Sequence, residues 1–530
     1  MADSDAGQQR RGAMPGQPVF IMQEGAERTQ GRDAQQSNIN AGKAIAESVR
    51  STLGPKGMDK MLVNDGGDVT ITNDGATILD EMDIEHPAAQ MLVEVAESQE
   101  DEVGDGTTTA VILAGELLSE AEEFIDQDIH PRTIVEGYNQ AGQIAQEAID
   151  EVVLDDALDD DLLASVAATS MTGKGTGDVD AETLAEAVVE AVRRAEAEDG
   201  IDRDAISVTT RTGESAGATR VIDGVVVEND RTYESAGRAL TDATVAVVED
   251  MEVGTAETDA EYAIESPDQY DSVLEAENRE LKEYADHLID LGVDAVFVDG
   301  SVDRVTENRF ERAGIMLFNA FEGDDIDKIA RTTGARKLTK ATDAEPDDLG
   351  HAHDVRVERF EGDEHVFVEG SGERTVTLFV RAGTGHVLDE LERAIGDAVD
   401  VVVAALDAGG VVPGAGAVEL AIADRLREEA TAIEGREQLA VEAVADAFDA
   451  IPRTLAQNTG MDSIDALVDA RARFEAEGRA GLVASGETGT IADPVEHGVL
   501  DPTAVKREAV RSAVEAASMI VRIDDVISAE

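Results

Sequence analysis

The sequence contains no cysteine. It therefore excludes a disulfide framework, thiol catalysis and any metal site built from thiolates. Long hydrophobic segments are also missing: apolar runs such as Val401 to Leu406 are too short to span a bilayer, and residues 1–18 contain no apolar export-signal core. These absences predict a cytoplasmic protein without a membrane-spanning helix, and a disordered tail over residues 1–18.

Lysine is scarce, with nine residues against 34 arginines, and the 43 basic residues face 115 acidic ones, which leaves a formal net charge of −72. A nucleic acid or an anionic membrane requires a basic surface, so the composition argues against both as partners. The acidic side chains would repel one another at low ionic strength. Molar salt shortens the screening length to about 3 Å and so weakens this repulsion. The acidity therefore indicates a salt-filled cytoplasm rather than a particular chemistry.

The 530 residues exceed what one core normally supports, so we expect two to four domains. Helical patterns dominate at about 38–157 and again from about 386, with a mixed α/β pattern at about 220–380. The helical patterns toward the two ends of the chain predict a discontinuous helical domain, with the α/β part inserted at its centre. The strand-like runs are Val221–Val227, Thr244–Val248 and Val293–Val298, followed by a predicted three-strand meander of Asp354–Phe360, Glu364–Val368 and Arg374–Val380.

The most informative stretch is Gly104-Asp105-Gly106-Thr107-Thr108-Thr109, which leads directly into the apolar run Ala110–Leu118. Its glycines allow the backbone to approach an anion, and the first N–H groups of a helix favour negative charge. The Thr hydroxyls can donate, and Asp105 can hold Mg²⁺. The stretch predicts a site for a metal-bound phosphate; a merely capped helix start is the alternative.

Two further glycine turns precede this loop. Leu53-Gly54-Pro55-Lys56-Gly57 closes a helix-like segment in which Ile45, Val49 and Leu53 recur at helical spacing. Thr70-Ile71-Thr72 is a short β-branched run that turns at Asn73-Asp74-Gly75, which predicts an exposed turn with Asp74 at the end of a strand. Each turn carries groups that could serve a phosphate, although a structural role for a turn aspartate stays open.

These motifs recur in the order and approximate spacing of a known family. The series continues with Thr169-Ser170-Met171-Thr172-Gly173-Lys174-Gly175 and Val521-Arg522-Ile523-Asp524-Asp525, and Gly31-Arg32-Asp33-Ala34-Gln35 stands near the start. From about Gln17 to Ile527 the chain resembles a group II chaperonin subunit of the archaeal thermosome type, related to the eukaryotic cytosolic chaperonin. Together with the charge, this resemblance suggests a halophilic archaeon as the source.

The resemblance implies a mixed α/β, multidomain architecture. A mainly helical equatorial ATPase domain would span 19–157 and 414–530, and a small α/β intermediate domain 158–227 and 378–413. The α/β apical domain would span 228–377, with a helical protrusion acting as a built-in lid at about 265–290. Leu274, Leu281 and Leu288 repeat every seven residues there; a packed helix is the alternative.

The resemblance also assigns roles. Asp105 would coordinate Mg²⁺, Asp74 would place the attacking water, and Asp397, within Glu392–Ala398, would activate it; such use of carboxylates suits phosphoryl transfer to water. Lys174 would sense the γ-phosphate. A surface aspartate and a mobile surface loop are the alternatives for Asp397 and Lys174. The implied nucleotide contacts are Leu53, Gly54, Pro55, Gly75, Gly104, Gly106, Thr107, Thr108, Thr109, Gly414 and Gly416, with Asp501 at the ribose.

The chain departs from the family pattern at three places. Ala415 stands between Gly414 and Gly416 where the family has a glycine, so a turn that needs a positive φ there must adjust. The segment Thr232–Ala236 lacks the family's usual proline, and Val526–Glu530 does not continue into a Gly-Met-rich tail. These departures suit a specialised paralogue.

The implied function is an ATP-dependent chaperone that binds non-native proteins and encloses them in a double ring. Its cofactors would be ATP and Mg²⁺, with K⁺ as a further candidate, and its partners would be copies of itself or paralogous subunits. The alternatives are a specialised or mainly architectural ring subunit with weak ATPase activity, and an unrelated kinase or phosphatase using the same loop. The clients, the ring's composition and an eight- or nine-fold symmetry stay open.

Overall fold

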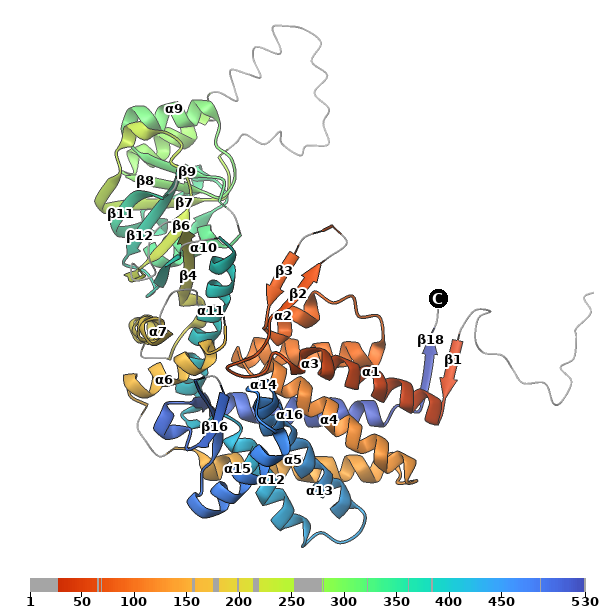
Figure 1. The fold of residues 1–530 in the computed structure, drawn as a ribbon. Helices are drawn as coiled ribbons and strands as arrows, with labels where there is room; N and C mark the ends of the chain where they lie inside the picture. Colours follow the sequence, from red (N-terminus) through yellow and green to blue (C-terminus); the bar gives the residue numbers. More distant parts are fainter. Residues whose placement is uncertain are drawn as a thin grey trace, which may run out of the picture.

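The computed structural model describes residues 27–528 apart from 64–65, 68, 155–157, 175–180, 198–199, 213–218, 252–278, 280, 322, 361, 383–384 and 487 (Figure 1). The predicted tail at 1–18 lies outside these residues. Within the described part of the chain, no helix combines the length and apolar character needed to cross a membrane.

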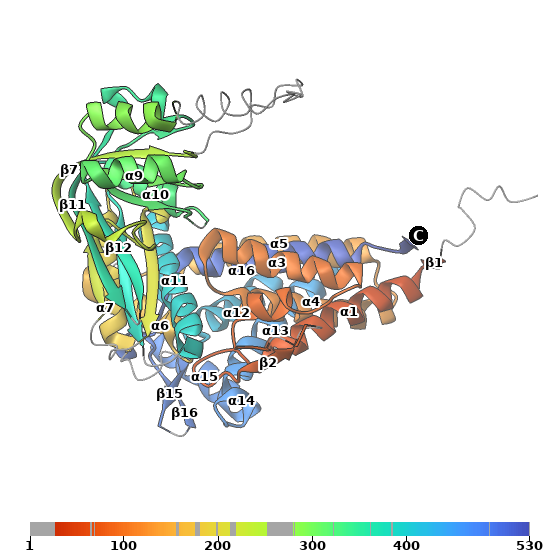
Figure 2. The ribbon, with the colours of Figure 1, turned by 90° about the horizontal axis from the view of Figure 1, so that it is seen from above.

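Helices from the two ends of the chain form one elongated body, in which they run alongside one another (Figure 2). The central helix α4 buries its apolar run, and α16 packs against α3, α4 and α5. A single hydrophobic core joins side chains from both halves, including Ile112 and Val514. The helices are α1 (Arg32–Arg50), α2 (Gly75–Asp80), α3 (Pro87–Val103), α4 (Thr107–Asp126), α5 (Pro131–Val152), α12 (Ala417–Ala430), α13 (Glu437–Phe448), α14 (Ala450–Asn458), α15 (Ser463–Glu477) and α16 (Thr503–Val521).

Short two-stranded sheets are attached to this helical body. The two ends meet where β1 (Glu27–Gln30) pairs antiparallel with β18 (Asp525–Ser528). The other pairs are β2 (Lys60–Val63) with β3 (Val69–Thr72), β14 (Val411–Pro413) with β17 (Leu500–Pro502), and β15 (Gly481–Ser485) with β16 (Thr488–Ala492).

A smaller unit connects the body to the α/β middle. It contains α6 (Asp160–Met171), α7 (Ala181–Ala195) and the long α11 (Gly385–Ala408) around a sheet ordered β4 (Ile206–Thr212), β13 (Val376–Ala382) and β5 (Arg220–Asp223). Its core also reaches Val103 at the end of α3 and Val505 in α16. The connecting unit therefore packs next to the loops that precede α4 and α16.

The α/β middle stands away from the helical body in Figure 1. Its sheet runs in the order β6-β12-β11-β7-β8-β9, with β10 beside β7, and α9 and α10 pack on it. The neighbours β7, β8 and β9 are parallel and β11 and β12 antiparallel. The bounds are β6 (Val225–Glu228), β7 (Ala239–Val248), β8 (Ala295–Val298), β9 (Met316–Asn319), β10 (Lys337–Leu338), β11 (Gly350–Phe360), β12 (Asp363–Gly370), α9 (Arg304–Ala313) and α10 (Asp325–Thr333).

Two strand predictions are wrong in detail. The predicted meander contains only the hairpin β11–β12, because β13 leaves for the other sheet, where it pairs parallel with β4 and antiparallel with β5. The run Val221–Val227 is two strands, broken at Gly224, whose φ of 108° is unsuited to other residues. Alternation identifies a strand but not its partner, which depends on distant residues.

The predicted protrusion at 265–290 lies mostly outside the described residues, as does Leu274. Its last part, 281–290, is helical. Leu281 and Leu288 are buried there in the core of the α/β middle, together with Phe310. At these two positions the heptad spacing therefore reflects an ordinary packed helix.

Candidate nucleotide-binding site

A cavity of about 470 Å³ lies between the helical body and the connecting unit. Loops from distant parts of the chain form it: the turn after α1, the β3–α2 and α3–α4 loops, the end of α6, and the starts of α12 and α16. The predicted residues that line it are Leu53, Gly54, Pro55, Asp74, Gly75, Asp105, Gly106, Thr107, Thr108, Thr109, Lys174, Gly416 and Asp501.

The α3–α4 loop presents free amides to this cavity. Gly104 ends α3 and Gly106 begins α4, both in the left-handed region at φ 65° and 84°. Gly106 has no side chain to cap the helix, and the first intrahelical bond runs from the Ala110 N–H to the Gly106 carbonyl at 3.0 Å. The N–H groups of Thr107–Thr109 are thus left for an anion, which makes the capped-start alternative the weaker one.

Asp105 is fixed within this loop. Its Oδ1 accepts from the Gly106 N–H at 2.7 Å, and its carbonyl accepts from Gln99 Nε2 at 2.7 Å. Gln99 also donates to the Val505 carbonyl at 3.3 Å, which joins the loop to α16. Burial raises the pKa of Asp105, and Lys174 opposes this rise. A cation beside the carboxylate would favour its charged form.

The β3–α2 loop packs directly on the α3–α4 loop. Asp74 caps α2, with its Oδ2 accepting from the Thr77 N–H at 2.7 Å. A Cβ on Gly75 would lie 2.5 Å from Thr108 Oγ1, so a larger residue would push the loops apart. The predicted turn at the end of a strand is confirmed, but its expected exposure is wrong: Asp74 is half-buried and starts a helix.

The segment after α6 closes this end of the cavity. Asn73 Nδ2 donates to the Gly173 carbonyl at 2.7 Å. Lys174 Nζ donates to Asp397 Oδ2 in α11, and the two side chains are only 15% and 13% exposed. Both surface alternatives are therefore wrong. Asp397 does not line the cavity itself; it reaches the cavity through Lys174.

Carboxylates outnumber cations around this pair. Burial raises the pKa of Asp397 to about 6, although Lys174 lowers it. Burial lowers the pKa of Lys174, but Asp397 and Asp105 outweigh burial and leave it raised. Glu100 belongs to the same electrostatic cluster: burial, Asp397 and Asp74 raise its pKa to about 8. No local motif singled out Glu100, which is one helical turn before the end of α3.

The surplus of carboxylates is compatible with a divalent cation. No group of three or more His, Cys, Asp or Glu side chains suited to a metal occurs within the described ranges. Mg²⁺ commonly uses only one or two carboxylates and completes its shell with phosphate oxygens and water. The buried Asp105 beside the free amides fits this mode of binding.

Part of the cavity lining is apolar. Ile451, Leu455, Leu482 and Val483 line it, and sequence reasoning identified none of them. They look like ordinary core residues in the sequence, so nothing marks them as part of a cavity wall. Asp501 in β17 supplies a further carboxylate to the lining, and its charge helps to raise the pKa of Asp105.

Gly104 and Gly414 do not line the cavity. Gly414 supports it: its N–H donates to the Val499 carbonyl at 2.9 Å, and a Cβ on it would lie 3.2 Å from Asp501 Oδ2. Next to it, Ala415 lines the cavity at a φ of 56°. The turn has thus kept the left-handed conformation with an alanine, at a steric cost.

The free amides, the buried carboxylates and the lysine are groups that suit a phosphorylated ligand with a metal ion. The sequence model of the TCP-1/cpn60 chaperonin family matches residues 45–530, and the chain belongs to this family. It is 59% identical to "Thermosome subunit 3" of Haloferax volcanii over 97% of this chain and 99% of the relative. It is 49% identical to "Thermosome subunit 1" of the same organism and 47% identical to "Thermosome subunit alpha" of Halobacterium salinarum, each over 97% of this chain and 92% of the relative.

The expected family and fold class are thereby confirmed, and the protein is an ATP-dependent chaperonin of the group II type with ATPase activity. The kinase or phosphatase alternative is excluded.

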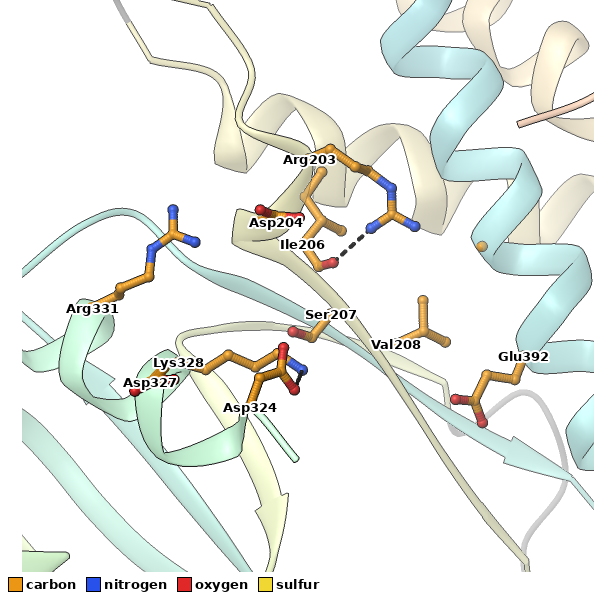
Figure 3. Close-up of a pocket in the computed structure, with 11 residues that line it drawn as sticks. Arg203, Asp204, Ile206, Ser207, Val208, Asp324, Asp327, Lys328, Arg331 and Glu392 are labelled. Carbon is orange, nitrogen blue, oxygen red and sulfur yellow. Dashed lines mark hydrogen bonds and ion pairs between the residues drawn. The ribbon is translucent and has the colours of Figure 1, made fainter. Parts of the chain in front are cut away.

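A second cavity, of about 420 Å³, lies where α10 faces β4 and α11 (Figure 3). Its cations are already paired within the described chain: Lys328 with Asp324 at 3.1 Å, Arg331 with Asp202 and Glu373, and Arg203 with Asp400. Paired charges are a poor recognition set for a ligand. The cavity marks the junction between the α/β middle and the connecting unit.

Proposed function

We propose that the first cavity binds ATP with Mg²⁺ and hydrolyses it, with the phosphates at the Thr107–Thr109 end. The observation that carries this proposal is that free helix amides, Asp105, Asp74 and the Lys174–Asp397 pair converge at one end of a nucleotide-sized cavity. The apolar part of the cavity lining would contact the adenine, and Asp501 would contact the ribose.

The chain's groups have distinct tasks in this proposal. Mg²⁺, when bound, neutralises phosphate charge. Asp105 holds the ion, and the amides of Thr107–Thr109 receive phosphate oxygens. Asp74, which lines the cavity, orients a water in line with the γ-phosphorus, and Asp397 reaches this water once the γ-phosphate has drawn Lys174 away from it. The oxygen of the water forms the new P–O bond while the bond to the β-phosphate oxygen breaks. Asp397, with a pKa of about 6, is ionised at neutral pH and can accept the water's proton.

In this proposal, Lys174 couples the bound nucleotide to the conformation of the connecting unit. It faces both Asp397 and Asp105, so a γ-phosphate would compete with Asp397 for its ammonium group. Asp397 belongs to α11, which directly follows β13 and packs on β4. A change at the Lys174–Asp397 contact would therefore tilt the unit that carries the α/β middle, which would open or close the part of the predicted protrusion before Leu281 over a client.

The assembly we propose is a double ring of this chain with itself or with paralogous subunits, acting on non-native proteins in a halophile's cytoplasm. Two relatives from one organism bear numbered subunit names, which supports paralogous partners. A mainly architectural subunit has no observation in its favour. K⁺ is a further candidate cofactor, and nucleic acids and membranes are not proposed as partners.

Binding of Mg-ADP, measured by titration calorimetry in molar KCl, tests the site. Asp105→Asn should weaken binding by roughly tenfold or more because the metal loses its ligand. Asp101→Asn, an exposed aspartate in the preceding turn, is the matched control. Equal affinities for both variants would refute the placement of the metal.

A further inference from the structure

One buried lysine has no role in the function proposed above. Lys506, in the first turn of α16, lies between two carboxylates: its Nζ is 2.9 Å from Glu419 Oε1 in α12 and 2.9 Å from Asp501 Oδ2 in β17. The side chains of Lys506, Glu419 and Asp501 are 11%, 3% and 16% exposed. The triad thus joins α12, β17 and α16 beside the cavity.

Among the described residues, the ion pairs of the triad are confined to its three members, although Asp501 raises and Lys506 lowers the pKa of Asp105 nearby. Within the described chain, no second cation pairs with Asp501 or Glu419, and Glu419 Oε2 is buried without a partner. Burial lowers the pKa of Lys506, but Asp501 and Glu419 outweigh burial, so the ammonium stays charged. Replacing buried ion pairs with apolar residues is often neutral for stability, so stability alone explains this arrangement poorly.

Its three members differ in their access to the cavity. Asp501 and Lys506 line it, whereas Glu419 does not. Glu419 therefore pairs with Lys506 from outside the cavity, and Lys506 pairs with Asp501 at the cavity lining. A Cβ on Gly414 would lie 3.2 Å from the same Asp501 oxygen, Oδ2, so the glycine leaves room for the carboxylate. Lys506 restrains Oδ2, which leaves Oδ1 as the acceptor available to a ligand.

We propose that Lys506 is a positioning residue that aims Asp501 at a ribose hydroxyl and so sets the preference of this site for ribonucleotides over deoxynucleotides. This inference rests on the proposed function, because it takes the cavity to hold ATP with its ribose at Asp501. A hydroxyl bond to a correctly placed carboxylate supports discrimination of roughly tenfold or more against an analogue without that hydroxyl.

The test compares kcat and KM for ATP, 2′-deoxyATP and 3′-deoxyATP in molar KCl. The wild type should prefer ATP over at least one analogue by roughly tenfold. The double substitution Lys506→Met with Glu419→Met avoids leaving Glu419, the more deeply buried carboxylate, without its cation, although Asp501 still loses its ion pair. The single substitution Lys506→Gln keeps a polar side chain should the double variant fail to fold. In either variant KM for ATP should rise until the ratio of kcat/KM for ATP to kcat/KM for the deoxy analogue approaches one. The value of kcat should change by less than about threefold.

Lys43→Met is the matched control, because Lys43 forms a part-buried ion pair with Glu122 at 2.7 Å, outside the cavity lining. It should keep the wild-type preference. A folded Lys506 variant that keeps this preference overturns the inference. This includes a variant in which kcat/KM falls by the same factor for all three nucleotides.

Asp501→Ala separates the remaining outcomes. If Asp501→Ala abolishes the preference while Lys506 variants retain it, only the role of Lys506 fails. If the wild type shows no preference, the ribose assignment and the inference both fail, whereas hydrolysis at Asp105 and Asp397 still stands. If Asp105→Asn does not alter nucleotide binding, the placement of the metal is wrong. If neither Asp105→Asn nor Asp501→Ala alters nucleotide binding, the proposed site itself is wrong.

Discussion

Lys174, beyond the end of α6, donates a hydrogen bond to Asp397 in α11, 223 residues further along the chain. This contact links the segment beside the phosphate end of the cavity to the longest helix of the connecting unit. A buried ion pair is sensitive to any third charge that competes for one partner. The pair is therefore well placed to respond to the presence of a γ-phosphate.

Asp397→Ala should slow ATP turnover by roughly 10²-fold or more while leaving ATP binding nearly intact, because a group that orients water acts mainly in the transition state. Steady-state phosphate release and calorimetry give the two quantities. Asp407→Ala, an exposed position on the same helix, is the control and should retain turnover. Normal turnover in Asp397→Ala would remove Asp397 from the mechanism.

The pH dependence of kcat should have an acidic limb near pH 6. The pKa of Asp397 is raised to about 6, so the ionised form that accepts a proton predominates above this value and is lost below it, by tenfold for each pH unit. A pH–rate profile at constant KCl measures the limb. In Asp397→Asn the residual rate should lack it, and a limb that persists there would assign it to another group.

The assembly should dissociate or unfold when KCl falls from molar to about 0.1 M, where the screening length grows to about 10 Å. The net charge of −72 per chain would then repel neighbouring subunits. Light scattering across a KCl series gives the mass, and NaCl at equal ionic strength controls for a specific effect of K⁺. A ring of unchanged mass in dilute buffer would contradict the salt-adapted interpretation.

Ala415→Gly should raise thermal stability by up to about 1 kcal/mol per subunit, because glycine adopts the observed φ of 56° without steric cost. Ala417→Gly, two residues later in α12, should instead lower stability by about 1 kcal/mol, since it places glycine in a helix. Thermal unfolding at fixed KCl compares the two variants. A lower unfolding temperature for Ala415→Gly would mean that the methyl group contributes packing that outweighs the strain.

Limited proteolysis tests the proposed lid. The segment from 265 should be cut readily without nucleotide and protected by ATP with a phosphate mimic, and cleavage should stop before Leu281, which is buried with Leu288. In Lys174→Ala, protection should fail although ATP still binds. Equal cleavage of the wild type with and without nucleotide would refute a nucleotide-driven lid.

Much of the local structure could be predicted because it depends on neighbouring residues. The glycine loop before a helix at Thr107 is confirmed, as are strands at the predicted positions of β7, β8, β11 and β12. Helix starts and strand periodicity arise from sterics and hydrogen bonds within a few residues. The end of α1 was misplaced, because the helix ends at Arg50, three residues before Leu53. The break at Gly224 within the predicted strand Val221–Val227 was also missed.

Long-range relationships could not be predicted from the residues alone. Lys506 meets Glu419 across 87 residues, and Glu100 joins the carboxylate cluster through Asp397 on another helix. Nothing within a few positions of Lys506 or Glu100 distinguishes either from an ordinary surface charge. The same reason explains the wrong partner for β13, since strand pairing is decided by the packing of the whole unit.

The sequence by itself determined the charge, the absence of thiol chemistry, the loops that begin helices and the ordered motifs that identify the family. Composition and short-range backbone geometry carry that information directly. Only the tertiary structure decided that Lys174 and Asp397 are largely withdrawn from water, that Ala415 holds a left-handed turn and that Lys506 restrains Asp501. These properties depend on burial and on contacts between residues far apart in the chain, and these contacts exist only once the helices from both ends have packed into one core.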